Sequence, residues 1–183
     1  MKGLVFVELV AMAEDAFGED VIDMVIDRAN LPSGGAYTAV GNYPCDELMT
    51  LVRGFSQHSG IPGPALQRLF GHWMMNSFVK HYPDFFVGRS GSLDMLAAIE
   101  DEIHVEVRKL YPDADLPQFD IVRPDDETMQ MTYRSPRPLA DFCHGLIEGC
   151  VTHFGETAVI ERNDRVTGGR NEADFNIRIG AKT

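Results

Sequence analysis

The spacing of apolar residues changes about two-thirds of the way along this chain, and that change constrains the fold more than any other feature. Before it, apolar residues recur every three or four positions, as at Leu93 and Leu96, which indicates helices. After it, Met129, Met131 and Tyr133 alternate with polar neighbours, which indicates strands. We therefore expect an α+β fold, mainly helical at first and then a four-stranded antiparallel sheet with one inserted helix.

Glycine and proline mark the boundaries of the expected elements. Gly18 ends the first helix, Pro64 lies near the start of the fourth, Ser92 is a plausible N-cap, and Pro112 ends the fifth. The expected helices span residues 4–17, 20–29, 46–56, 64–81, 93–111 and 139–154. The expected strands lie around residues 119–121, 129–133, 157–162 and 174–179. With 183 residues, the chain has the size of a single domain.

Charge and cysteine content narrow the classes of function. Sixteen Lys and Arg residues against 28 Asp and Glu residues give a net charge of −12, which disfavours nucleic-acid binding. Three cysteines without CxxC spacing fit a reducing compartment better than a disulfide framework. There is no signal-peptide pattern and no apolar stretch approaching the roughly 20 residues of a membrane span. We expect a cytoplasmic protein without a membrane partner.

His104 is the first residue that suggests chemistry. It is expected on the apolar side of the helix over residues 93–111, beside Ile103 and one turn before Val107, in a stripe that Glu100 interrupts. A core histidine hydrogen-bonded to the backbone is the ordinary interpretation of such a position. The alternative is an axial haem ligand, because a buried helix can present an imidazole nitrogen to a flat apolar cofactor.

The segment from Tyr133 to Arg137 is the second such feature. Because alternate residues of a strand share a face, Tyr133, Ser135 and Arg137 project together. Two hydroxyls and a guanidinium beyond an apolar strand face suit a ligand with an apolar plate and a carboxylate edge. An ordinary sheet with a polar end gives the same spacing, so this pattern alone does not distinguish a ligand-binding strand from an ordinary one.

Together these residues identify a family resemblance over essentially the whole chain. The matching features, in chain order, are the opening Met1-Lys2-Gly3, Asp101-Glu102-Ile103-His104, Pro117, the Tyr133-x-Ser135-x-Arg137 motif and Gly145-Leu146-Ile147-Glu148-Gly149. The chain resembles the haem nitric oxide/oxygen-binding (H-NOX) domains, bacterial relatives of the sensor domain of soluble guanylate cyclase.

The resemblance implies haem b, iron protoporphyrin IX, buried between the helices and the sheet. His104 would be the proximal iron ligand and the only metal ligand from the protein. Tyr133, Ser135 and Arg137 would hold the haem propionates, and Pro117 would press on the porphyrin. It also implies an N-terminal helical subdomain, residues 1–60, and a haem-ligating subdomain, residues 61–183.

The resemblance further implies which gas binds. Oxygen-binding relatives carry a tyrosine where this chain has Phe142, and Met74 stands where a residue supporting that tyrosine is expected. His144 lies about 200° around the helix from Phe142 and should face elsewhere. Bound oxygen gains from a hydrogen-bond donor, whereas nitric oxide needs one much less, so we expect nitric oxide selectivity. The expected apolar pocket consists of Val5, Leu9, Met74, Phe78, Phe142 and Leu146.

The implied function is a haem-based gas sensor for nitric oxide, which also binds carbon monoxide. It would signal in trans to a separate histidine kinase or diguanylate cyclase. No nucleophile–base pair is visible, so no enzyme is expected. An oxygen-binding or haem-storage protein stays open as the alternative. A haem peroxidase or nitric oxide dioxygenase would need polar acid–base groups in the pocket where the gas is expected to bind, which we call the gas side.

Overall fold

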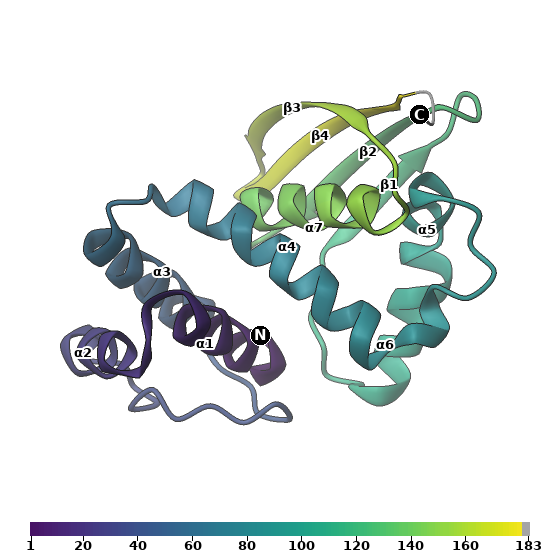
Figure 1. The fold of residues 1–183 in the computed structure, drawn as a ribbon. Coiled ribbons are helices and arrows are strands. Elements are labelled where there is room, and N and C mark those ends of the chain that lie inside the picture. Colours follow the sequence, from purple (N-terminus) through teal and green to yellow (C-terminus); the bar gives the residue numbers. More distant parts are fainter. Residues whose placement is uncertain (181–183) are drawn as a thin grey trace.

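A computed structural model describes residues 1–180 and has helices in its first half and a sheet in its second (Figure 1). The helical elements are α1 (Gly3–Phe17), α2 (Glu19–Ala29), α3 (Cys45–Ser59), α4 (Gly63–His81), η1 (Pro83–Phe85), α5 (Ser92–Ala97), η2 (Ile99–Ile103), α6 (His104–Leu110) and α7 (Ala140–His153). The strands are β1 (Gln118–Val122), β2 (Thr128–Ser135), β3 (Ala158–Thr167) and β4 (Arg170–Ile179). None of the helices within residues 1–180 is long and apolar enough to cross a bilayer.

The four strands form one antiparallel sheet in the order β1-β2-β4-β3, which confirms the expected α+β class. Gly168 and Gly169 join β3 to β4 with φ of 59° and 77°, as a two-residue hairpin turn requires. Between β1 and β2, the Asp125 carboxylate accepts the backbone N–H groups of Glu127 and Thr128 at 2.9 and 2.8 Å. The inserted helix α7 lies across one face of the sheet (Figure 1).

Two apolar clusters make up the core. The first joins the N-terminal helices and includes Phe6, Leu51 and Phe70. The second lies between α5, α7 and the sheet and includes Tyr133 and Phe175. The side chain of Leu146 on α7 packs against both clusters, so α7 connects the two halves of the molecule.

Helices α4 and α7 approach each other closely because glycines line their contact. A Cβ atom added at Gly145 would collide with the Arg68 carbonyl oxygen, and one at Gly71 would collide with the Phe142 carbonyl oxygen. At Gly149 an added Cβ would lie 2.9 Å from the Met75 Cβ atom. The glycines of the 145–149 motif therefore have a packing role.

The helix expected over residues 93–111 is not continuous, which corrects the sequence prediction. A π-helical turn, η2, separates α5 from α6, and the Ile103 N–H donates to the Ala98 carbonyl five residues back, at 3.1 Å. The extra residue in this turn shifts the helix phase, so Leu110, expected on the apolar stripe, is 60% exposed. Ser92 is also not an N-cap, because Gly91 takes that position and the Ser92 hydroxyl donates to Glu156.

The α4–α7 contact predicts the effect of one substitution. Gly145→Ala puts a methyl group against the Arg68 backbone, so we expect it to lower the free energy of unfolding by about 1–3 kcal/mol. Gly63→Ala is the matched control, since its Cβ would meet only the Val52 Cγ1 atom at 3.8 Å. Urea denaturation measures both variants, and equal stability of the two would contradict this account of the contact.

Candidate functional site

His104 is the first residue of α6 and follows the π-helical turn directly. Its side chain is buried, at 8% exposure. The Nδ1 atom lies 3.2 Å from Glu100 Oε1, and within residues 1–180 the ring makes no other hydrogen bond. The Nε2 atom is therefore left without a hydrogen-bonding partner from the described part of the protein.

The protonation state of His104 suits a metal ligand. Burial lowers the pKa of His104, and the Glu100 carboxylate opposes this only in part. At neutral pH the ring is therefore neutral, and a proton on Nδ1 directed at Glu100 leaves the lone pair on Nε2. A ligating histidine usually donates its second ring N–H in this way to a carboxylate or a carbonyl. This contact favours the ligand interpretation over that of a core histidine bonded to the backbone.

Glu100 is a residue of the site that the sequence does not identify, since there it only interrupts an apolar stripe. Its Oε1 atom accepts the backbone N–H of Phe119 on β1 at 2.8 Å as well as facing His104. The ring of Phe119 lies 5.8 Å from that of His104 and 5.7 Å from that of Tyr133. The sequence feature that could have identified Glu100 is its four-residue spacing from His104, because side chains four residues apart lie together on a helix.

Tyr133 and Ser135 are buried on the same face of β2. The strand ends at Ser135, so Arg137 lies beyond it rather than on its face, which differs from the sequence prediction. The three residues are nevertheless adjacent. The Arg137 backbone N–H donates to Ser135 Oγ at 3.1 Å, and the Tyr133 hydroxyl donates to the Arg137 carbonyl at 3.5 Å. Burial raises the pKa of Tyr133, so its hydroxyl keeps its proton.

The guanidinium of Arg137 already holds a carboxylate. Its Nη2 atom lies 2.7 Å from Asp115 Oδ2, and Nη1 donates to the Asp115 carbonyl at 2.6 Å. Asp115 lies two residues before Pro117, which directly precedes β1. No sequence pattern indicates this pair, and any second carboxylate at Arg137 has to share or displace it.

The opening residues attach the N-terminal helices to the loop after α6. Lys2 Nζ lies 2.6 Å from Asp113 Oδ1. A Cβ atom at Gly3 would collide with the Thr38 carbonyl oxygen, so a side chain there would push the chain away. The Met-Lys-Gly opening of the family resemblance therefore has a structural reason in this chain.

The expected gas-side residues come together in the first apolar cluster. Leu9 and Met74 are fully buried in it, and the other four pack against it. The Phe142 ring lies 4.9 Å from that of Phe70, whereas the His144 ring lies on the sheet side, 5.6 Å from that of Phe175. The four others are Val5, Phe78, Phe142 and Leu146.

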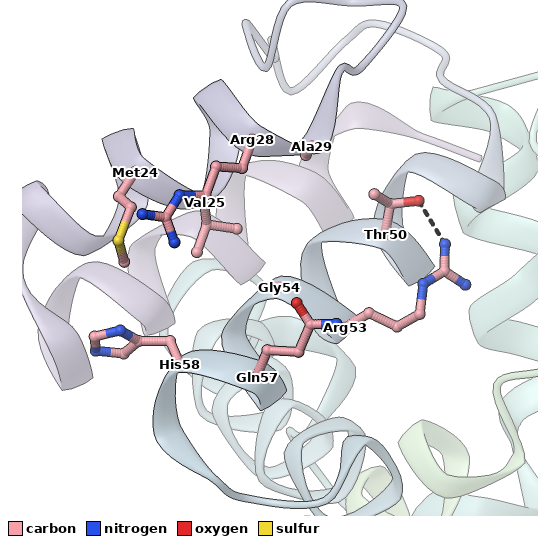
Figure 2. Close-up of a pocket in the computed structure, with 9 residues that line it drawn as sticks. All are labelled: Met24, Val25, Arg28, Ala29, Thr50, Arg53, Gly54, Gln57 and His58. Carbon is pink, nitrogen blue, oxygen red and sulfur yellow. Dashed lines mark hydrogen bonds between the residues drawn. The ribbon is translucent and has the colours of Figure 1, made fainter.

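A surface pocket of about 470 Å³ lies elsewhere, between α2 and α3 (Figure 2). Arg28 and Arg53 line it, and Figure 2 shows their guanidinium groups pointing to opposite ends. Arg53 donates to Thr50 Oγ1 on its own helix at 2.8 Å. None of the residues expected to hold a ligand contributes to this pocket.

The chemistry of the residues expected to hold a cofactor fits the haem that the sequence resemblance implies. A buried neutral imidazole has a free Nε2 atom. Arg137, beside two hydroxyl groups, binds a carboxylate as it would a propionate. An apolar cluster contains the residues expected on the gas side.

Comparisons with known proteins agree with this chemistry. Residues 2–162 match the family described as Haem-NO-binding. The H-NOX protein of K. algicida in its Fe(II) unliganded form is 32% identical with a TM-score of 0.92, over 99% of this chain and 97% of that one. The IWP-051-bound H-NOX of Shewanella woodyi in the Fe(II)CO state is 37% identical with a TM-score of 0.83, over 100% of this chain and 96% of that one.

A more distant structure, a mutant of the T. tengcongensis H-NOX, is 23% identical with a TM-score of 0.88 over 100% of both chains, and supports the fold alone. The search of curated protein sequences finds no match. The family match and the K. algicida and S. woodyi structures each span most of the chain. The chain therefore belongs to the Haem-NO-binding, or H-NOX, family of haem-based gas sensors.

Proposed function

We propose that this protein is a nitric oxide sensor that binds haem b through His104 and signals to a separate histidine kinase or diguanylate cyclase. The observation that carries the proposal is the buried His104 ring, with Nδ1 facing Glu100 and Nε2 unpartnered among residues 1–180. Haem supplies the iron that binds a diatomic gas. Nitric oxide and carbon monoxide are the proposed ligands, and the cytoplasm is the proposed location.

Residues of this chain would hold and shape the cofactor. Arg137 contributes the positive charge for a propionate, and the Tyr133 and Ser135 hydroxyls contribute hydrogen bonds. Pro117, at the start of β1, is proposed to press on the porphyrin. His104 is the only protein ligand to the metal in this proposal.

The apolar gas side supports selectivity for nitric oxide. Two of the donors packed on that cluster already have acceptors, since Trp73 Nε1 donates to Glu8 at 2.8 Å and the Tyr37 hydroxyl donates to Glu47 at 2.9 Å. Oxygen takes up negative charge and gains from a donor, and a hydrogen bond to a charged partner is worth about 1.5–3 kcal/mol. Nitric oxide needs such a donor much less.

We further propose that release of His104 from the haem would be the signal, with haem supplying the iron whose hold on the imidazole would loosen on gas binding. Helix α6 would then move relative to the N-terminal helices, with residues 1–60 and 61–183 acting as two subdomains. The Lys2–Asp113 ion pair connects the loop after α6 to the N-terminus, and we propose that it would transmit such a movement.

Spectra under different gases test the proposed function. The full chain is loaded with haem, reduced, and its visible spectrum recorded under argon, air, carbon monoxide and nitric oxide. We expect both carbon monoxide and nitric oxide to shift the spectrum, and air to give no stable oxygen complex. A stable oxygen complex would instead favour an oxygen-binding protein, and bound haem without any gas response would favour haem storage. Peroxide turnover would reveal an enzyme.

Replacing His104 tests the ligand assignment. His104→Gly should alter the ferrous spectrum and the gas response, and added imidazole should restore both, because the free base takes the place of the lost side chain. His144→Ala is the matched control, since His144 is the other buried histidine of residues 1–180. A His104→Gly protein that behaves like wild type without imidazole would show that another group binds the iron.

Phe142→Tyr tests the account of selectivity. A hydroxyl at this position adds a donor to the apolar cluster, so oxygen affinity should rise on the order of tenfold or more. Oxygen titration of the ferrous protein measures the change. Phe142→Leu keeps the site apolar and should leave oxygen binding as weak as in wild type; an equal gain in both variants would contradict the role of the donor.

Arg137→Gln tests the proposed propionate contact. Loss of a charge-assisted hydrogen bond should speed haem release about tenfold. Arg134→Gln is the control, because Arg134 lies on β2 between Tyr133 and Ser135 and pairs with Asp120 and Glu172 instead. The rate of haem transfer to an acceptor protein measures both, and matching rates would rule out a specific contact at Arg137.

A further inference from the structure

We propose that Glu100 is a positioning residue for His104: its carboxylate fixes the imidazole tautomer and strengthens Nε2 as a ligand to the haem iron. The inference rests on the proposed function, because it concerns the residue assigned there as the iron ligand. It is carried by hydrogen bonds that Glu100 makes in this chain, rather than by the histidine alone.

One oxygen of the Glu100 carboxylate, Oε1, makes contacts on two sides. Oε1 lies 3.2 Å from His104 Nδ1 and accepts the Phe119 backbone N–H at 2.8 Å. The side chain is three-quarters covered, with 26% exposed, so solvent reaches it only in part. A carboxylate fixed by a strand backbone cannot swing away freely, and it therefore defines the direction of the Nδ1–H bond.

The other neighbouring acids do not share this position. Glu102 is on the same π-helical turn, but its carboxylate is exposed and pairs with Arg89, with Nη2 and Oε2 2.5 Å apart. Asp101 is exposed as well. Of the acids on the turn, Glu100 is the one whose carboxylate faces the imidazole.

A carboxylate that accepts the Nδ1 proton of an imidazole changes how strongly the ring binds a metal. A proton on Nδ1 that is shared with a negative oxygen leaves more electron density on the ring, so Nε2 becomes a stronger donor. The neutral amide of glutamine keeps the shape of Glu100 but removes its charge. Glu100 should therefore make His104 a stronger ligand for the iron and oppose its release.

Resonance Raman spectra and redox titration of the haem-loaded protein test the proposal. Glu100→Gln should shift the Fe(II)–histidine stretching band to lower frequency and the midpoint potential to a more positive value, because the ligand donates less charge. Glu102→Gln, the same change two residues away, should match wild type on both measurements. Unchanged values in Glu100→Gln, or equal shifts in both variants, would overturn the proposal.

A measurement without haem tests the tautomer directly. Nitrogen-15 NMR of the histidine side chains in the haem-free wild-type chain should find the His104 proton on Nδ1. A proton on Nε2 would overturn the proposal even if Glu100→Gln does not fold. A wild-type protein without an iron–histidine band would overturn the proposed function as well, whereas a band that Glu100→Gln leaves unchanged overturns this inference alone.

Discussion

The close approach of α4 and α7 is the contact on which the arrangement of the two cores depends. Because Gly71 and Gly145 have no side chains, the backbones of these helices meet directly, and a Cβ atom at either position would collide with the facing backbone. Phe142 on α7 packs against the helical cluster, while Cys143 and Cys150, each about a quarter turn around the helix from it, lie in the cluster against the sheet. Burial raises the pKa of each thiol to about 12, so both are uncharged core side chains. A looser crossing would separate the proposed gas side from the rest of the site.

The second organising contact is the carboxylate between α6 and β1. Glu100 joins the π-helical turn, the His104 ring and the backbone of Phe119 through a single oxygen. Burial keeps the imidazole neutral, and the carboxylate faces Nδ1, which leaves Nε2 without a hydrogen-bonding partner among residues 1–180. The chemistry of the site therefore follows from local packing: the same side chain that closes the gap between helix and strand also orients the proposed ligand.

Much of this architecture was predictable from the pattern of residues. The change in apolar spacing gave the order of helices and strands, and the alternation through Met131 and Tyr133 gave the buried face of β2. The π-helical turn was not predictable, because the only sign of it in the sequence is the interruption of the apolar stripe at Glu100, which a continuous α-helix also allows. The ion pair of Arg137 with Asp115 joins residues distant in the sequence, and nothing local indicates it. Spacing alone also left the role of His104 open.

The proposed function requires that a single buried imidazole, that of His104, binds the haem iron. A crystal structure of the haem-loaded chain, with iron located by its anomalous X-ray scattering, tests it most directly. We expect one iron atom at bonding distance from His104 Nε2, with Nδ1 still facing Glu100. An iron atom bound to any other side chain, or a His104 ring remote from the porphyrin, would contradict it.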